Sequence, residues 1–144
     1  MGLRREGREA AIQILYSVDA GNRDDFDEGR DRFWSLHTAK AKVRGRGEEL
    51  AQAVIGRMEE IDDTISRSTA NYQLDRLSVV DRNILRLAVY EMLFEEEVPN
   101  PVAINEAIEI AKGFGTPESG RFVNGVLDRV RRDLEGQGPT GTDG

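Results

Sequence analysis

Arginines and an aromatic ring are the side chains of this sequence whose types and spacing best suit ligand binding. Arg4, Arg5 and Arg8 fall within an arc of about 100° if a helix begins that early, so they are expected to form one basic face. Arg121 precedes Phe122. Bases of single-stranded RNA stack on aromatic rings, while their phosphates pair with guanidinium groups. The two groups therefore indicate RNA binding.

Each group also has a structural interpretation that the residues alone leave open. The N-terminal arginines are alternatively a frayed, solvated terminus that Glu6 and Glu9 partly neutralise. Phe122 is alternatively a core residue. A glycine inside a helix costs about 1 kcal/mol relative to alanine, so Gly125 suggests that another backbone or a ligand approaches it closely.

Other chemistry has little support in this sequence. The chain contains one histidine, no cysteine and no glycine loop that could hold a phosphate, so no metal centre and no nucleophile with its base is expected. We interpret His37 as a surface residue. Glu91 is expected to be buried and paired, and we favour a structural role for it over that of a catalytic acid. No enzyme activity, cofactor or metal is predicted.

Composition predicts one globular domain over residues 1–135 and a disordered tail over 136–144, which is rich in glycine, threonine and proline. The lack of cysteine, of a signal-like segment and of an apolar run long enough for a membrane predicts a cytoplasmic protein. The net charge is −7, but the segment from Arg30 to Arg46 contains six basic residues and one acid. The charge is therefore expected to be polarised.

Every long segment with a hydrophobic period has the helical one, which predicts an all-α fold. The first three expected helices cover about residues 5–20, 24–36 and 50–68. A buried helix follows, which Ser78 and Asp81 open. The next helix is capped by Asn100 and ends at Gly115, and a last helix follows Pro117. The basic segment from Lys40 to Gly47 is expected to be a flexible connection, because it contains two glycines and shows no core face.

Four segments resemble the NusB family of bacterial transcription antitermination factors. They are Arg8–Tyr16, Asp81–Glu91, Pro101–Gly115 and Phe122–Asp128. The resemblance spans most of the chain from Arg4 to Leu134. It implies about seven helices in two packed three-helix subdomains. It also implies an adaptor that binds the boxA element of nascent ribosomal RNA together with NusE, a small-subunit ribosomal protein, and acts indirectly on the elongating RNA polymerase.

The resemblance also implies roles for particular residues. The RNA-binding candidates are Arg4, Arg5, Arg8, Tyr72, Lys112, Arg121 and Phe122. The candidates for contact with NusE are Asp81, Arg82, Glu118 and Phe122. Tyr72 stands where the family has a tryptophan, so an aromatic ring is kept while its size changes. Glu6 and Gly7 interrupt the N-terminal basic run, from which we expect a low affinity for RNA in the absence of a partner.

Three questions stay open at the level of sequence. The segment from Lys40 to Arg46 matches no family motif, and it is either a solvated linker or an auxiliary RNA contact. RNA cytosine methyltransferases carry a similar N-terminal domain, so a stand-alone targeting domain for RNA modification is one alternative function. A homodimer that masks the RNA surface is the other.

Overall fold

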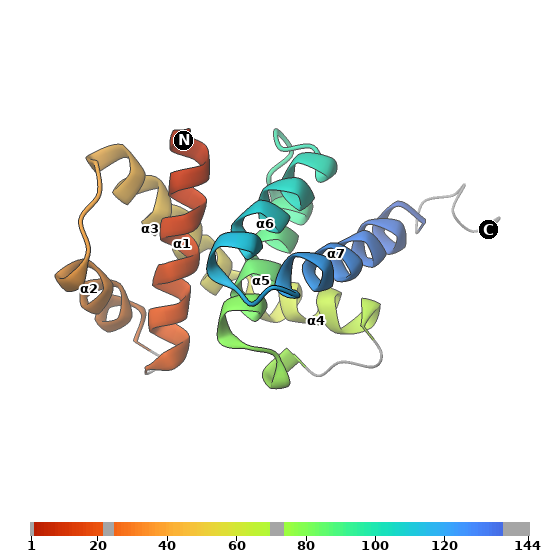
Figure 1. Ribbon diagram of the computed structural model, residues 1–144, viewed down its shortest axis with the longest axis horizontal. Coiled ribbons are helices and arrows are strands. Elements are labelled where there is room, and N and C mark those ends of the chain that lie inside the picture. The colour runs from red at the N-terminus through yellow and green to blue at the C-terminus, as the bar shows by residue number, and fades with distance from the viewer. Residues whose placement is uncertain (1, 22–24, 70–73, 137–144) are drawn as a thin grey trace. The chain divides into compact units, whose positions relative to one another are not determined.

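The computed structural model describes residues 2–21, 25–69 and 74–136 (Figure 1). All regular structure in these ranges is helical, which confirms the all-α prediction and the expectation of about seven helices. The elements are α1 (Leu3–Ala20), α2 (Phe26–Leu36), α3 (Ala41–Gly56), α4 (Met58–Ser68), the short 3-10 helix η1 (Leu74–Arg76), α5 (Val79–Phe94), α6 (Asn100–Phe114) and α7 (Ser119–Gly136). Tyr72 and residues 137–144 of the predicted tail lie outside the described residues.

The chain divides into two compact units, Met1–Met58 and Glu59–Gly144. In the first unit, α1 packs against both α2 and α3. The apolar stripe of α1 makes this packing possible, because Ala11, Ile14 and Leu15 recur at helical spacing and are all buried. The N-terminal end of α1 is thereby fixed to a rigid three-helix framework.

The basic segment is helical from Ala41 to Gly47, with Lys40 as the N-cap of α3, and the prediction of a flexible connection is wrong. Val43 is buried and gives the segment a core contact that the sequence reading overlooked. Gly47 lies against α1, where an added Cβ would lie 2.7 Å from the Cβ of Ala10. The lack of a side chain at Gly47 therefore allows α1 and α3 to pack closely. This tertiary contact offsets the cost of a glycine within a helix.

The helix expected over residues 50–68 is two helices, α3 and α4, which meet at Arg57. The backbone N–H of Arg57 donates to the carbonyl of Val54 at 3.1 Å, which is the tighter i→i−3 bond of a helix end. The exposed Gly56 precedes this turn. The continuous apolar stripe of the sequence therefore did not reveal that the helix is interrupted at Arg57.

In the second unit, α5 packs against α6 and α7. Every residue from Arg82 to Val89 is buried, as predicted for the central helix. The hydroxyl of Ser78 accepts a hydrogen bond from the backbone N–H of Asp81 at 3.1 Å, which confirms Ser78 as the N-cap of α5. A rigid buried helix thus begins at a residue predicted from sequence alone.

The start of α6 differs from the prediction by one residue. Pro99, not Asn100, is the N-cap, and its carbonyl accepts from the backbone N–H groups of Val102 and Ala103 at 3.0 and 3.1 Å. A backbone acceptor therefore begins this helix without a side-chain cap. Gly115 ends α6 as predicted, with its N–H bonded to the carbonyl of Ala111 at 2.9 Å.

Candidate nucleic-acid interface

The three N-terminal arginines occupy the first two turns of α1 but differ in exposure. Arg4 is exposed and Arg5 is partly exposed, whereas Arg8 is only 7 % exposed. Arg8 lies one turn before Ala11, at the edge of the buried stripe, which explains its burial. The exposed part of the predicted basic face is therefore formed by Arg4 and Arg5.

A second group of candidates gathers where α6 ends and α7 begins. Glu118 lies in the turn, Arg121 and Phe122 lie in the first turn of α7, and Lys112 lies in the last turn of α6. Gly120 packs against Lys112, because a Cβ added to Gly120 would lie 3.3 Å from the lysine Cγ. The four candidates thus share one helix corner within the second unit.

Hydrogen bonds fix the shape of this corner. The buried hydroxyl of Ser119 accepts from the backbone N–H of Thr116 at 2.9 Å, and the N–H of Ser119 donates to the Thr116 carbonyl at 3.0 Å. Gly115 leaves room for Ser119, because a Cβ there would lie 2.6 Å from the serine Cβ. The turn is therefore rigid before any ligand arrives.

The charges at this corner are mixed. Lys112 is paired with Glu109 at 3.0 Å, and both Glu118 and Arg121 are exposed. Phe122 is partly exposed, so it is neither a fully buried core residue nor a fully exposed one. An arginine beside a partly open ring is an arrangement that can take a base and its phosphate.

Gly125 lies one turn further along α7 and faces open space. No atom of the described residues outside its own helix turn comes within 4 Å of a Cβ built there. Close packing within this part of the chain therefore does not explain the glycine, and the explanation by a ligand stays a prediction.

The two candidates at the start of α5 have different environments. Asp81 is partly exposed, but its Oδ1 atom is buried and has no hydrogen-bond partner among the described residues. Arg82 is only 5 % exposed, and its Nη1 donates to the carbonyls of Leu74 and Leu77 at 3.3 and 3.5 Å. The guanidinium of Arg82 thus holds the segment that leads into α5 and does not extend into solvent.

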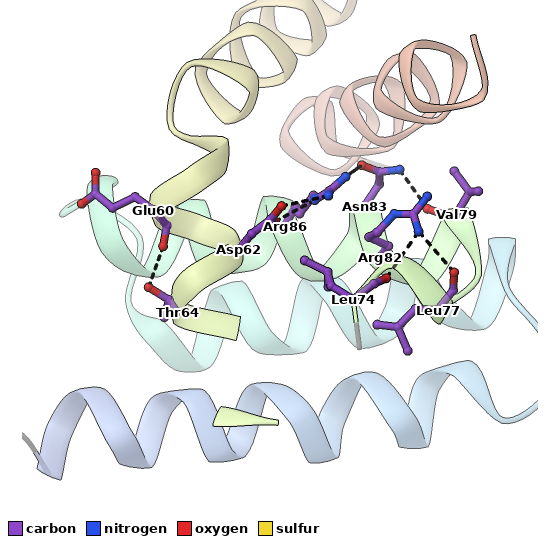
Figure 2. A network of polar contacts seen from close by, with 9 residues as sticks. All are labelled: Glu60, Asp62, Thr64, Leu74, Leu77, Val79, Arg82, Asn83 and Arg86. Carbon is purple, nitrogen blue, oxygen red and sulfur yellow. Dashed lines mark hydrogen bonds and ion pairs between the residues drawn. The ribbon is translucent and has the colours of Figure 1, made fainter. Parts of the chain in front are cut away.

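Next to Arg82 lies a polar network that the sequence reading missed (Figure 2). Arg86, on the buried helix α5, binds both carboxylate oxygens of Asp62 on α4, with Nε at 2.9 Å and Nη2 at 3.0 Å. Its Nη1 donates to the side-chain carbonyl of Asn83 at 3.4 Å, and the Asn83 amide donates to the Val79 carbonyl at 2.9 Å. This bidentate pair fixes α4 against α5.

The remaining sequence candidates lie apart from these groups. Glu91 is 2 % exposed, as expected of a buried carboxylate. His37 is exposed, as expected, and stacks on Phe33. In the part of the chain that the structure describes, no three acidic, histidine or cysteine side chains are grouped to hold a metal ion. None of the helices in these ranges is long and apolar enough to cross a membrane.

The RNA-binding candidates among the described residues therefore form two groups in different units. Arg4 and Arg5 belong to the first unit, and the corner of α6 and α7 belongs to the second. The expectation that the arginines and the Phe122 ring share one surface stays a prediction.

Comparison with known proteins identifies the family. A model of the NusB family matches residues 5–132. The transcription antitermination protein NusB of Desulfosudis oleivorans is 45% identical over 138 residues, which cover 94% of this chain and 90% of that protein. The solved structure of NusB from T. maritima is 40% identical, with a TM-score of 0.77, and the match covers 90% of this chain and 91% of that one.

A further solved structure contains the antitermination factors NusB and NusE in complex with dsRNA. Its matching chain is 25% identical with a TM-score of 0.77, and the match covers 91% of this chain and 97% of that one. The agreement thus extends over nearly the whole of each relative, in sequence as well as in fold. The chain is a member of the NusB family.

Proposed function

We propose that this chain is a non-enzymatic adaptor in transcription antitermination, which binds the boxA element of nascent ribosomal transcripts together with NusE. The observation that carries the proposal is the match to the NusB family over residues 5–132. A related chain of the same fold occurs in a complex with NusE and dsRNA, which supports both partners. RNA polymerase is reached indirectly, through the assembled complex.

The geometry of the corner between α6 and α7 supports this role. Phe122 offers a partly open ring and Arg121 an exposed guanidinium on a turn that Ser119 holds rigid. A base stacks on the ring, and the guanidinium pairs with a phosphate. Because the corner is already ordered, little conformational entropy is lost when RNA binds.

The charge of the chain supports dependence on a partner. A net charge of −7 disfavours RNA binding in general, since phosphates are repelled by the acidic body. A basic partner bound alongside supplies the missing attraction, so RNA and NusE each strengthen the binding of the other. An adaptor of this kind avoids unrelated RNA when NusE is absent.

The test is a titration of boxA RNA with and without NusE, followed by fluorescence anisotropy. We expect NusE to raise the affinity for RNA by roughly 5- to 150-fold, the usual range of coupling between two sites. Phe122→Leu keeps apolar volume but removes the ring, and we expect it to weaken binding by about tenfold, the loss of one stacked base. Phe122→Tyr keeps the ring and serves as the matched control.

Two further variants separate the candidate surfaces. Arg5→Ala tests the N-terminal group, whereas Arg67→Ala removes an exposed arginine from α4 and serves as a control for charge. If NusE does not change RNA affinity, and Arg5→Ala and Phe122→Leu bind as the wild type does, the proposal is wrong. Sedimentation at several salt concentrations shows whether a homodimer competes with this assembly.

A further inference from the structure

Planar and cationic side chains that the proposed boxA contact does not use gather at the junction of α2 and α3. We define this α2–α3 corner by His37, Lys40, Lys42 and Arg44, all of which are exposed. The corner lies entirely within the first unit. In Figure 1 the connection between the two helices carries the chain to the N-terminal turn of α3.

Two planar groups of the corner are already stacked on aromatic rings. The imidazole of His37 lies over the ring of Phe33, with ring centroids 4.4 Å apart and planes inclined by 20°. The guanidinium of Arg44 lies over the Trp34 ring, with its Cζ 4.8 Å from the centroid. Trp34 in turn meets Phe33 edge to face at 4.7 Å. These contacts hold one face of each planar group and leave the groups exposed to solvent.

The cations of the corner are only partly neutralised. Arg44 binds Glu48 through its Nε at 3.2 Å, and Arg46 pairs with Glu49. Lys40 and Lys42, by contrast, are exposed and have no ion-pair partner among the described residues. The first turn of α3 contains no acidic residue, so both ammonium groups lie where the helix dipole disfavours them. A phosphate bound there relieves this repulsion.

An independent observation is the exposed apolar side chain that precedes His37 in the sequence. Leu36 is 77 % exposed at the end of α2 and directly precedes His37. A lone leucine is too small for a stable protein interface or a membrane contact. A base that stacks on the His37 imidazole covers apolar surface of this kind, while lysines take the adjoining phosphates.

We propose that the α2–α3 corner is an auxiliary site for single-stranded RNA, which binds transcript outside the boxA element. His37 stacks with a base, Arg44 adds a second planar face, and Lys40 and Lys42 bind the phosphate backbone. The inference rests on the proposed function, since it assumes that the chain is brought to a transcript. Of the two interpretations of the segment from Lys40 to Arg46, a solvated linker and an RNA contact, the inference favours the RNA contact.

The experiment compares two RNAs in the presence of NusE. One contains the boxA element alone, and the other extends it by about ten nucleotides on each side, enough for a further single-stranded site. The first variant carries both Lys40→Ala and Lys42→Ala. We expect it to bind the extended RNA more weakly and to lower the slope of log affinity against log salt by about 1.4, or roughly 0.7 for each phosphate contact with a single strand.

His37→Ala tests stacking, and we expect it to weaken binding of the extended RNA by about tenfold. Both variants should bind the short RNA as the wild type does. A variant with Arg67→Ala and Arg132→Ala removes two exposed cations from the second unit and should leave both RNAs unaffected. The melting temperature of the lysine variant should be equal to or above that of the wild type, because cations leave a helix N-terminus.

The outcomes of these titrations separate the auxiliary site from the proposed function. If the lysine variant binds the extended RNA as tightly as the wild type does, the auxiliary site is excluded while the proposed function stands. If polyglutamate competes as well as RNA of equal length, the corner is a general anion site and stacking is excluded. If the wild-type chain with NusE does not bind the short RNA, the proposed function itself fails.

Discussion

At the scale of single residues, the second unit places charged groups inside an otherwise apolar helix. Arg82 and Arg86 are 5 % and 4 % exposed, yet each guanidinium reaches oxygen acceptors in its surroundings. Burial of such a charge is costly unless it is paired and hydrogen-bonded. The two arginines therefore tie α5 to the 3-10 segment and to α4.

Loss of the Arg86 side chain should lower stability more than loss of an exposed arginine. Arg86→Ala leaves Asp62 without its bidentate donor, and we expect the free energy of unfolding to fall by about 2 to 3 kcal/mol. The Asp62 side chain is 28% exposed, so water partly replaces the hydrogen bonds that the carboxylate loses in this variant. Urea denaturation measures the change.

Two controls accompany this measurement. Arg86→Lys keeps the charge but offers no fork of donors, so it should restore only part of the loss. Arg67→Ala, on the exposed face of α4, should change the free energy of unfolding by less than about 0.5 kcal/mol. Equal effects of Arg86→Ala and Arg67→Ala would show that the pair contributes nothing.

This network was beyond the reach of sequence reasoning for a physical reason. The apolar period predicted that α5 is buried, and Ser78 predicted where it begins, because both are local signals. An arginine on such a helix is consistent with a surface, a ligand site or a buried pair, and the choice depends on a carboxylate 24 positions away in the chain.

At the scale of elements, α3 shows how packing overrides local preference. Propensity predicted a loop from Lys40 to Gly47, because glycine is a poor helix residue. The structure contains a helix, since Gly47 allows α1 to approach and Val43 is buried. Only the neighbouring helix distinguishes a glycine that breaks a helix from one that packs against another backbone.

Two glycines of α3 give a matched test of this explanation. Gly45 faces open space, so Gly45→Ala should raise the free energy of unfolding by about 0.5 to 1 kcal/mol. Gly47→Ala introduces a Cβ 2.7 Å from that of Ala10 and should lower stability by about 1 kcal/mol, because the cost of overpacking exceeds the gain in propensity. Thermal denaturation of both variants measures the difference. Stabilisation by Gly47→Ala would contradict the close contact.

Gly125 of α7 separates stability from binding. A Cβ there meets no described atom within 4 Å, so Gly125→Ala should stabilise the chain by about 0.5 to 1 kcal/mol. If RNA or NusE approaches this position closely, the same variant should also weaken the complex, by an amount that anisotropy titration measures. A variant that is more stable and binds as well as the wild type would exclude close approach at Gly125.

At the scale of the whole molecule, negative charge outweighs positive charge. With a net charge of −7, the chain should attract RNA only over short distances around its exposed arginines and lysines. The polarised charge expected from sequence stays a prediction, and the structure adds which cations are exposed. Arg4 and Arg5 retain exposure, whereas Arg8 is buried, a distinction that helical spacing alone did not make.

Salt dependence measures how many of these cations bind phosphate. We expect the affinity of the complex with NusE for boxA RNA to fall as salt rises, and Arg4→Ala to lower the slope of log affinity against log salt by about 0.7. Titrations in increasing potassium chloride provide the measurement. An unchanged slope would remove Arg4 from the RNA contact while leaving the contribution of Phe122 open to its own test.

The contact of α1 with α3 at Gly7 and Gly47 sets the phase of everything that precedes it on α1. An added Cβ at Gly7 would lie 3.0 Å from the Cγ of Arg46, so α1 has little freedom to rotate about its axis at this crossing. One residue inserted between Arg5 and Glu6 turns the first arginines by 100°, whereas seven inserted residues return them to within about 20° of their original direction. The chain thus encodes an angular register, in which the number of residues between Arg5 and Gly7 decides the side of the helix from which Arg4 and Arg5 project.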